Sequence, residues 1–237
     1  MKISEMKIPE HITLCEFESR EALTDSLCEL IKTRIQNSLN QSGRASIAVS
    51  GGSTPIPLFR QLSQAPLDWS AVTITLVDDR WVSPDHQDSN ERLVKENLLQ
   101  NQASASRFIG LWQENISAKE AEASCNQRLA ELDDPLNTVI LGMGNDGHTA
   151  SLFPCAKADL RAALASNKDC AATHPASAPH ARMTLTPKRL FNSDLRILHI
   201  CGQDKLDVLK KALKENDLQT MPISIFLQRP LTIYWAP

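Results

Sequence analysis

The stretch from Thr138 to Pro154, TVILGMGNDGHTASLFP, holds the side chains best suited to chemistry. His148 carries an imidazole, whose ordinary pKa allows it to accept and to release a proton near neutral pH. Asp146 lies two positions earlier and is close enough to orient or polarise that ring. The spacing predicts an acid–base pair at this turn. The alternative is structural: Asp146 caps the following segment, and His148 only binds a backbone carbonyl.

The residues before this pair indicate how it is positioned. Residues 139–141 are branched, apolar and uninterrupted, which is typical of a strand buried on both faces of a parallel sheet. Gly142, Gly144 and Gly147 then permit tight turning and a close approach of the backbone to a ligand, because glycine has no Cβ. Ligands of such sheets bind at the carboxyl ends of the strands. The sequence therefore predicts an active site directly after this strand.

The same glycines also match GxGxxG, the dinucleotide-binding fingerprint. That motif requires a long helix after its last glycine and an acidic residue about 20 positions further on, at the end of a strand. Pro154 follows too soon for an undisturbed helix, and Asp169 has no convincing strand before it. The sequence therefore disfavours a nicotinamide cofactor.

A second glycine-rich turn, SGGSTP, follows another predicted strand. Its last residue, Pro55, is placed to open a helix that continues through position 62. Exposed N–H groups of Gly51, Gly52 and Ser53, together with the positive end of the helix dipole, would favour an anion such as phosphate. The alternative is a capped turn in which Ser53 is simply the N-cap of the helix.

A third group of polar residues, Asp78, Asp79 and Arg80, follows a predicted strand at 72–77 and is expected in a loop at the same edge of the sheet. An arginine at the end of a strand can hold a substrate anion through two parallel hydrogen bonds. The alternative is an ion pair with the neighbouring carboxylates. Positions 88–91, DSNE, have capping-box spacing at the start of the next predicted helix, so a structural role is expected for both acidic residues.

Two basic residues follow in the second half of the chain. Arg182 begins RMTLT, a predicted strand at 182–186, and Lys205 lies in the first turn of the helix that starts within GQDK. A cation there is disfavoured by the helix dipole unless an anion lies nearby; the alternative is an exposed lysine that reaches water. His174 and His180 lie in a loop rich in proline and alanine, without ligand-like partners, and no catalytic role is expected for either.

Predicted strands and helices alternate along the chain, which is typical of a parallel sheet with helices on both faces. We therefore expect an α/β protein with one domain over residues 1–237 and an open, mostly parallel sheet of modified Rossmann type. A long helix is predicted from about Ser19, with Gly43 as its stop. The strands are predicted at 12–17, 46–49, 72–77, 108–112, 139–141, 182–186, 195–201 and 231–235.

Composition limits the class of protein. With 42% hydrophobic residues, 22% charged residues and a formal net charge of −3, the chain is typical of globular proteins and lacks the basic character of nucleic-acid-binding proteins. Its six cysteines are scattered without a CxxC pair, so we expect buried, reduced thiols and neither disulfide nor metal. The first residues lack an apolar signal core, and no run approaches the roughly 18 apolar residues of a membrane span, so a cytoplasmic protein is expected.

Five motifs in order resemble the 6-phosphogluconolactonase family, hydrolases of the pentose phosphate pathway: SGGSTP, DDRWV with the following SNERLV, GMGNDGHTASLFP, RMTLT and GQDK. The resemblance spans about Ser50 to Lys205. It implies the open α/β sheet already expected, which the family shares with sugar-phosphate isomerases and coenzyme A transferases. One departure is Asp79, where the family more often has glutamate.

The resemblance implies hydrolysis of 6-phospho-D-glucono-1,5-lactone to 6-phosphogluconate without a metal or cofactor. His148 would deprotonate the attacking water and return the proton to the leaving ring oxygen, Asp146 would hold the tautomer of His148, and backbone N–H groups near Gly144 would stabilise the oxyanion. Arg80 would bind either the phosphate or the sugar. The implied substrate-binding and phosphate-binding residues are Gly51, Gly52, Ser53, Asp78, Arg80, Gly144, Arg182 and Lys205.

Two alternatives share parts of this pattern. Glucosamine-6-phosphate deaminases have the same fold and a similar GxGxDGH turn, but their next residues run close to HIAFNEP, with a glutamate before the proline. Here the segment is HTASLFP, and Phe153 cannot relay a proton, so we expect it to pack under the loop as an apolar anchor. A non-catalytic sugar-phosphate sensor would not need His148. The expected partner is a small phosphorylated sugar lactone, bound by a monomer or weak homo-oligomer, with no nucleic acid or membrane.

Overall fold

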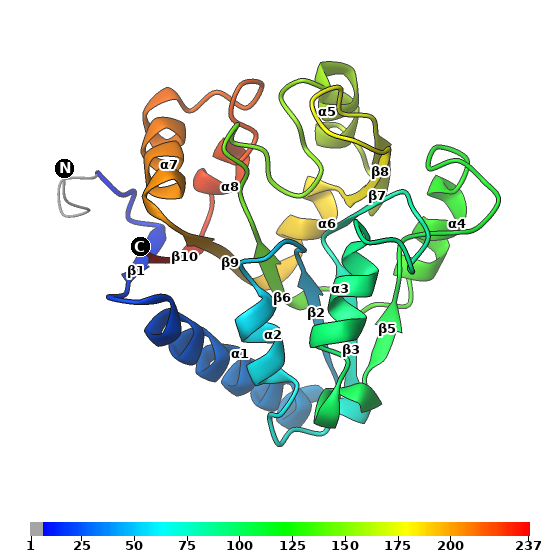
Figure 1. The fold of residues 1–237 in the computed structure, drawn as a ribbon, viewed down its shortest axis with the longest axis vertical. Coiled ribbons are helices and arrows are strands. Elements are labelled where there is room, and N and C mark those ends of the chain that lie inside the picture. The colour runs from blue at the N-terminus through cyan, green and yellow to red at the C-terminus, as the bar shows by residue number, and fades with distance from the viewer. Residues whose placement is uncertain (1–6) are drawn as a thin grey trace.

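The computed structural model describes residues 7–237, which form a seven-stranded sheet surrounded by helices (Figure 1). The strand order is β1-β10-β9-β6-β2-β3-β5, and every neighbouring pair is parallel. The predicted open, mostly parallel α/β sheet is therefore confirmed. The strands are β1 (Ile12–Glu16), β2 (Ala45–Val49), β3 (Val72–Leu76), β5 (Arg107–Ile109), β6 (Leu136–Leu141), β9 (Ser193–Cys201) and β10 (Leu231–Ala236).

The strand order reverses between β2 and β6, at the centre of the sheet. From β2 the chain continues to β3 and β5 on one side, and from β6 it continues to β9 on the other. All five residues of β2 are buried, as are residues 138–141 of β6, because helices cover both faces. Loops that leave two adjacent strands in opposite directions open a crevice at their carboxyl ends. The two glycine-rich turns follow β2 and β6 and therefore meet at this crevice.

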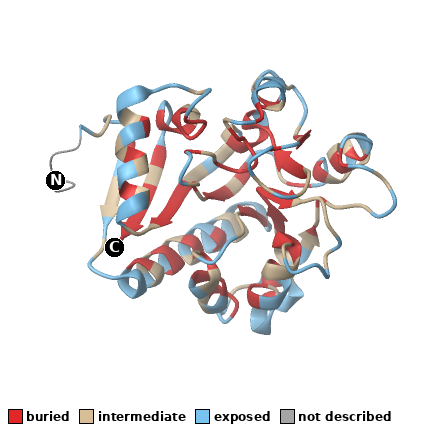
Figure 2. Ribbon diagram, turned by 45° about the horizontal axis from the view of Figure 1, so that its top comes forward, coloured by how far each residue is buried: buried red, intermediate tan, exposed pale blue. Residues whose placement is uncertain are grey.

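The helices turn their apolar sides to the sheet, and Figure 2 shows exposed residues along their outer surfaces. Helix α1 begins after the N-cap Ser19, whose side chain accepts the N–H of Ala22, and ends at Gly43 with a φ of 73°, so both predicted ends are confirmed. The helices are α1 (Arg20–Ser42), α2 (Ile56–Leu62), α3 (Asn90–Asn97), α4 (Glu122–Leu129), α5 (Lys157–Leu164), α6 (Pro187–Phe191), α7 (Gln203–Glu215) and α8 (Ser224–Leu227), with 3-10 helices η2 (Trp69–Ala71) and η3 (Asn101–Ala105).

Three short strands form a separate antiparallel sheet in the order β4-β8-β7. They are β4 (Asp78–Arg80), β7 (Cys170–Thr173) and β8 (Arg182–Leu185). The prediction that residues 78–80 lie in a loop is therefore wrong, because these residues pair with the strand that was predicted at 182–186. Strand β7 was not predicted, since its sequence CAAT has small residues and no alternating pattern.

Hydrogen bonds to the side chain of Asp79 connect the second sheet to helix α3. Its side chain is 1% exposed, and its carboxylate accepts the backbone N–H groups of Arg80 at 2.7 Å, Asn90 at 2.7 Å and Glu91 at 3.0 Å. The N-cap of α3 is Ser89, so the cap expected at position 88 is shifted by one residue. Burial raises the pKa of Asp79 to about 7, against the opposing effect of the hydrogen bonds from Asn90 and Glu91.

Some predicted boundaries and burials also differ. Strand β5 ends at Ile109, short of the predicted residue 112. Helix α4 begins at Glu122, after a turn in which Glu120 accepts the N–H of Ser117 and the hydroxyl of Ser117 accepts the N–H of Glu120. Cys155 is exposed, unlike the buried thiols that were expected. Between residues 7 and 237, no helix combines the length and the apolar character needed to cross a membrane.

Replacing Asp79 with asparagine tests its structural role. The amide group of asparagine would face a buried N–H donor, so the free energy of unfolding should fall by about 1–3 kcal/mol at pH 5. In the folded protein the pKa of Asp79 is raised to about 7, whereas in the unfolded chain it has its ordinary, lower value. The folded state therefore binds the proton more tightly, which stabilises the parent protein at low pH. This stabilisation is lost as the pH rises toward 7. The stability difference between parent and variant should therefore narrow from pH 5 to pH 8.

Urea unfolding at several pH values measures this difference, and Asp68→Asn, at an exposed carboxylate, is the control. A difference that widens as the pH rises would contradict the raised pKa of Asp79.

Candidate active site

A pocket of about 320 Å³ opens at the crevice between the loops that follow β2 and β6. Its wall is completed by β4, β8 and the start of α7. Asp146 does not line it but contacts His148, which does. All the predicted site residues therefore gather at one place. Those that line the pocket are Gly51, Gly52, Ser53, Asp78, Arg80, Gly144, His148, Arg182 and Lys205.

His148 and Asp146 form a direct pair at the edge of the pocket. The Nδ1 atom of His148 lies 2.5 Å from Oδ1 of Asp146, and the same oxygen accepts the backbone N–H of His148 at 3.1 Å. Burial opposes the ionisation of Asp146, but the side-chain hydrogen bond with His148, the charge of that ring and the backbone hydrogen bonds together outweigh burial and lower the pKa of Asp146 below its ordinary value. A charged carboxylate at Nδ1 favours the tautomer with its proton there. Nε2 of His148 is then free to accept a proton.

Gly144 provides the space that this pair needs. A Cβ at this position would lie 2.1 Å from Nδ1 of His148 and 2.6 Å from Oδ1 of Asp146. The N–H of Gly144 also donates to the carbonyl oxygen of His148 at 2.8 Å, which closes the turn. This N–H is therefore occupied, so a backbone donor to an oxyanion has to come from a neighbouring residue.

Phe153 supports the ring of His148. The two rings stack with their centroids 4.1 Å apart and an angle of 23° between their planes. Phe153 is 4% exposed, which confirms the buried anchor that was predicted. The guanidinium carbon of Arg182 lies 5.5 Å from the centroid of the same ring. Phe153 thus contacts both the candidate base and one of the candidate anion ligands.

Arg80 and Arg182 lie side by side on neighbouring strands of the second sheet. They are directly opposite in the register of β4 and β8, a position in which two like charges repel. The Nε atoms of both are buried and have no hydrogen-bond partner among the described residues. Arg80 Nη1 donates to the carbonyl oxygen of Asp88 at 2.6 Å, and Arg182 Nη2 to that of Pro179 at 3.3 Å. Burial lowers the pKa of Arg182, with Asp78 acting in the opposite direction. This arrangement is suited to an anion.

Asp78 connects the histidine loop to the second sheet. It precedes Arg80 by two residues and therefore lies on the same face of β4, whereas Asp79 lies on the opposite face. Oδ2 of Asp78 accepts the hydroxyl of Ser151 at 2.5 Å. The N–H of Ser151 donates to Oγ1 of Thr184 at 3.2 Å, and Thr184 stands opposite Asp78 in the sheet. Ser151 was not identified from the sequence.

The turn after β2 lies at the pocket with free backbone donors. The N–H groups of residues 51–54 make no backbone hydrogen bond to any other residue of the described chain. Ser53 is not the cap of α2, because the helix begins at Ile56 after Pro55 and has no side-chain cap. The alternative of a simple capped turn is therefore wrong. Gly52 has a φ of 91°, which orients the turn and which a side chain would disfavour.

Lys205 is half-buried at the start of α7 and lines the pocket, so it is not the freely exposed lysine of the alternative interpretation. Its Nζ donates to Oδ1 of Asn145 at 2.5 Å. Burial lowers the pKa of Lys205, against the effects of Asp204 and Asp146. An anion bound in the pocket would have the opposite effect and favour the charged form.

Two further pocket residues were missed by the sequence analysis. His199 is 5% exposed in β9, its Nδ1 has no partner among the described residues, and burial lowers its pKa to about 4, so the ring is neutral at pH 7. Asn90 donates from Nδ2 to the carbonyl oxygen of Asp78 at 2.8 Å, and its Oδ1 is buried without a partner in residues 7–237. The sequence did contain signals for both residues: His199 is a histidine within an apolar strand, and Asn90 lies at the start of a predicted helix.

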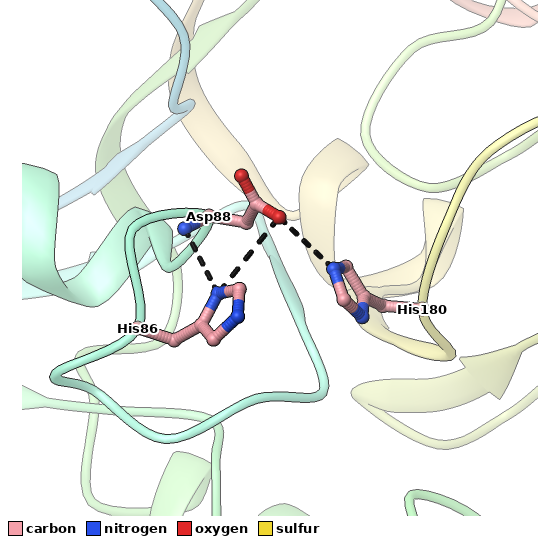
Figure 3. A group of neighbouring side chains, drawn as sticks. All are labelled: His86, Asp88 and His180. Carbon is pink, nitrogen blue, oxygen red and sulfur yellow. Dashed lines mark hydrogen bonds and ion pairs between the residues drawn. The ribbon is translucent and has the colours of Figure 1, made fainter.

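The expectation that His180 has no ligand-like partner is wrong. Nε2 of His180 lies 3.0 Å from Oδ2 of Asp88, and His86 lies beside both (Figure 3). Asp88 and His180 are 92 positions apart, so only the pairing of β4 with β8 brings their loops together. His174 has a weaker contact, with 3.6 Å between its Nδ1 and Oδ2 of Asp159.

Comparison with known proteins places this geometry in a family context. The model of a family described as "Glucosamine-6-phosphate isomerases/6-phosphogluconolactonase" matches residues 18–235. A 6-phosphogluconolactonase of Pseudomonas aeruginosa is 40% identical over 238 residues, with 100% of both chains covered. Another from Rhizobium meliloti is 43% identical and covers 93% of this chain and 97% of its own. The crystal structure of a 6-phosphogluconolactonase from Shewanella baltica matches with a TM-score of 0.94 and 41% identity, covering 97% of this chain and 100% of its own.

The facing arginines predict that the pocket binds inorganic phosphate. In phosphate-free buffer, Arg182→Ala should change the free energy of unfolding little, because it removes a repulsion along with its contacts. Loss of a charge-assisted hydrogen bond costs about 1.5–3 kcal/mol, so the variant should bind phosphate at least roughly tenfold more weakly. Isothermal titration calorimetry measures the affinity, with Arg34→Ala on the exposed side of α1 as control. Equal phosphate affinities of parent and Arg182→Ala would show that the anion lies elsewhere.

Proposed function

The chain belongs to the family of glucosamine-6-phosphate isomerases and 6-phosphogluconolactonases, and we propose that it hydrolyses 6-phospho-D-glucono-1,5-lactone to 6-phosphogluconate. The observation that carries this proposal is one pocket that holds a histidine–aspartate pair and two facing arginines. Hydrolysis of a phosphorylated lactone needs a base that activates water and a cationic site for phosphate. The pocket offers both.

His148 acts as the base. Its Nε2 accepts a proton from water as the oxygen attacks the lactone carbonyl, and the resulting imidazolium is stabilised by the charge of Asp146. The tetrahedral intermediate collapses when the bond from the carbonyl carbon to the ring oxygen breaks. His148 then returns the proton to that oxygen, which leaves the open-chain acid and restores the neutral imidazole. Phe153 holds the imidazole plane during both transfers.

The oxyanion of the intermediate needs a donor beside His148. The N–H of Gly144 is occupied by the carbonyl of His148, so we assign this role to the N–H of Met143. Met143 lines the pocket, and its N–H donates to no other residue of the described part of the chain. A preorganised N–H stabilises the developing charge more than water does, because it need not reorient during the reaction.

The phosphate is held at the arginine side of the pocket. Arg182 supplies one charge, and Arg80 shares the same anion because it stands directly opposite. Lys205 and the free N–H groups of Gly51, Gly52 and Ser53 complete the site. The neutral His199 and the free Oδ1 of Asn90 are suited to the sugar hydroxyl groups.

Deamination of glucosamine 6-phosphate is less well supported by the same pocket. The residue that stacks on His148 is Phe153, which has no group that could accept or relay a proton during ring opening. Lactone hydrolysis changes no oxidation state, so the chemistry needs no nicotinamide. We further propose that the protein acts in the cytoplasm, where the sugar phosphates of central metabolism are found.

His148→Ala tests the role of the base. Turnover of freshly generated 6-phosphogluconolactone should fall by about 100-fold to 10,000-fold, the usual contribution of a positioned acid or base, while inorganic phosphate should still bind. Lactones also hydrolyse unaided, so the spontaneous rate is subtracted at each pH. His174→Ala, at an exposed histidine outside the pocket, is the matched control and should keep the parent rate.

Two outcomes would overturn the proposal. Near-parental turnover in His148→Ala would remove the histidine from the mechanism. Ammonia release from glucosamine 6-phosphate by the parent protein, at a rate comparable with lactone hydrolysis, would favour the deaminase instead.

A further inference from the structure

We propose that His86, Asp88 and His180 form a binding site for a late first-row divalent cation such as Zn²⁺, outside the catalytic pair. Figure 3 shows the three side chains converging from two loops. One ligand atom of each lies within 4.8 Å of the other two. Two imidazoles and one carboxylate are a donor set that such cations favour, and open positions remain for water.

The geometry of the three side chains fits a metal ion. Oδ2 of Asp88 lies 3.0 Å from Nε2 of His180 and 3.8 Å from Nδ1 of His86. Ligand atoms of a tetrahedral zinc site are separated by about 3.3 Å, so these two distances lie on either side of the required value. Nδ1 of His86 now accepts the backbone N–H of Asp88 at 3.1 Å, and ligation would replace this contact. Small side-chain rotations therefore complete the site.

Access and charge also permit binding. The side chains of His86 and Asp88 are each 41% exposed and that of His180 is 28% exposed, so an ion can reach the site from solvent. Asp88 supplies the carboxylate of the donor set. The nearby charge of Arg80 opposes a cation. We therefore expect weaker binding than at a structural zinc site.

The position of the site gives the ion a structural consequence. His86 and Asp88 lie in the loop that follows β4, and His180 lies in the loop that precedes β8. The carbonyl oxygen of Asp88 accepts from Arg80, so a cation bound at Asp88 would also restrain that arginine. It would cross-link the two loops next to the strands that carry both facing arginines into the pocket.

A second histidine–aspartate contact in the same protein serves as a comparison for the proposed site. His174 and Asp159 are also a histidine–aspartate pair, with 3.6 Å between their nearest atoms, but they belong to no group of three metal-ligand side chains in residues 7–237. If a histidine–aspartate contact alone sufficed, both places would bind the ion equally. The proposal requires that only the group with two imidazoles does so.

Isothermal titration calorimetry with ZnCl₂ tests the site on full-length protein treated with EDTA and desalted. All proteins carry Cys155→Ser, because this exposed thiol is a competing zinc ligand. We expect one equivalent of Zn²⁺ to bind, with the affinity reduced at least tenfold by His86→Gln and by His180→Gln and unchanged by His174→Gln. Circular dichroism confirms that each metal-free variant is folded.

Protection of the loops provides a second readout. Zn²⁺ should slow hydrogen exchange at residues 82–89 and 174–181 in the Cys155→Ser parent and not in its His180→Gln variant. The proposal is overturned if Zn²⁺ binds the parent no better than the His86→Gln/His180→Gln double variant. It is also overturned if binding is lost in His148→Gln and kept in His180→Gln, because the ion would then lie at the catalytic pair.

Discussion

The repulsion between Arg80 and Arg182 is the constraint on which the arrangement of the pocket depends. The two arginines stand directly opposite on paired strands, and each has a buried Nε without a protein partner in the described chain. Such a pair is costly in a protein interior unless an anion occupies the space between them. The protein holds them there by binding their outer nitrogens to backbone carbonyls and by placing Asp78 on the same face. Two facing arginines with unpartnered Nε atoms are well suited to a doubly charged phosphate.

The second sheet places the two arginines opposite each other. The roles of the neighbouring aspartates depend on the alternation of side chains along β4. Asp78 faces the pocket and binds Ser151 of the histidine loop, whereas Asp79 faces the other way and binds the N–H groups at the start of α3. Neighbouring carboxylates thus have different tasks because successive strand residues point to opposite faces. Phe153 links the two halves of the site, since its ring lies against both His148 and Arg182.

The main sheet and the location of the site could be predicted because the signals are local. Buried strands read as apolar runs, glycine-rich turns mark their ends, and parallel topology brings those ends to one edge. Three features could not be predicted, because they depend on contacts distant in sequence. In the second sheet β8 was predicted as a strand, but its partners β4 and β7 are short segments with little pattern of their own, so Asp79 could not be separated from Asp78. His180 meets Asp88 across 92 positions. His199 could not be distinguished from an ordinary buried histidine until its place at the pocket was known.

A crystal structure of the protein with bound 6-phosphogluconate, the proposed product, would test the central claim most directly. The account predicts that the phosphate lies between the guanidinium groups of Arg80 and Arg182 and contacts both. It also predicts that the carboxylate formed from the lactone carbonyl lies within hydrogen-bond distance of Nε2 of His148. A phosphate bound away from the two arginines, or a carboxylate distant from His148 with the phosphate in place, would contradict the account.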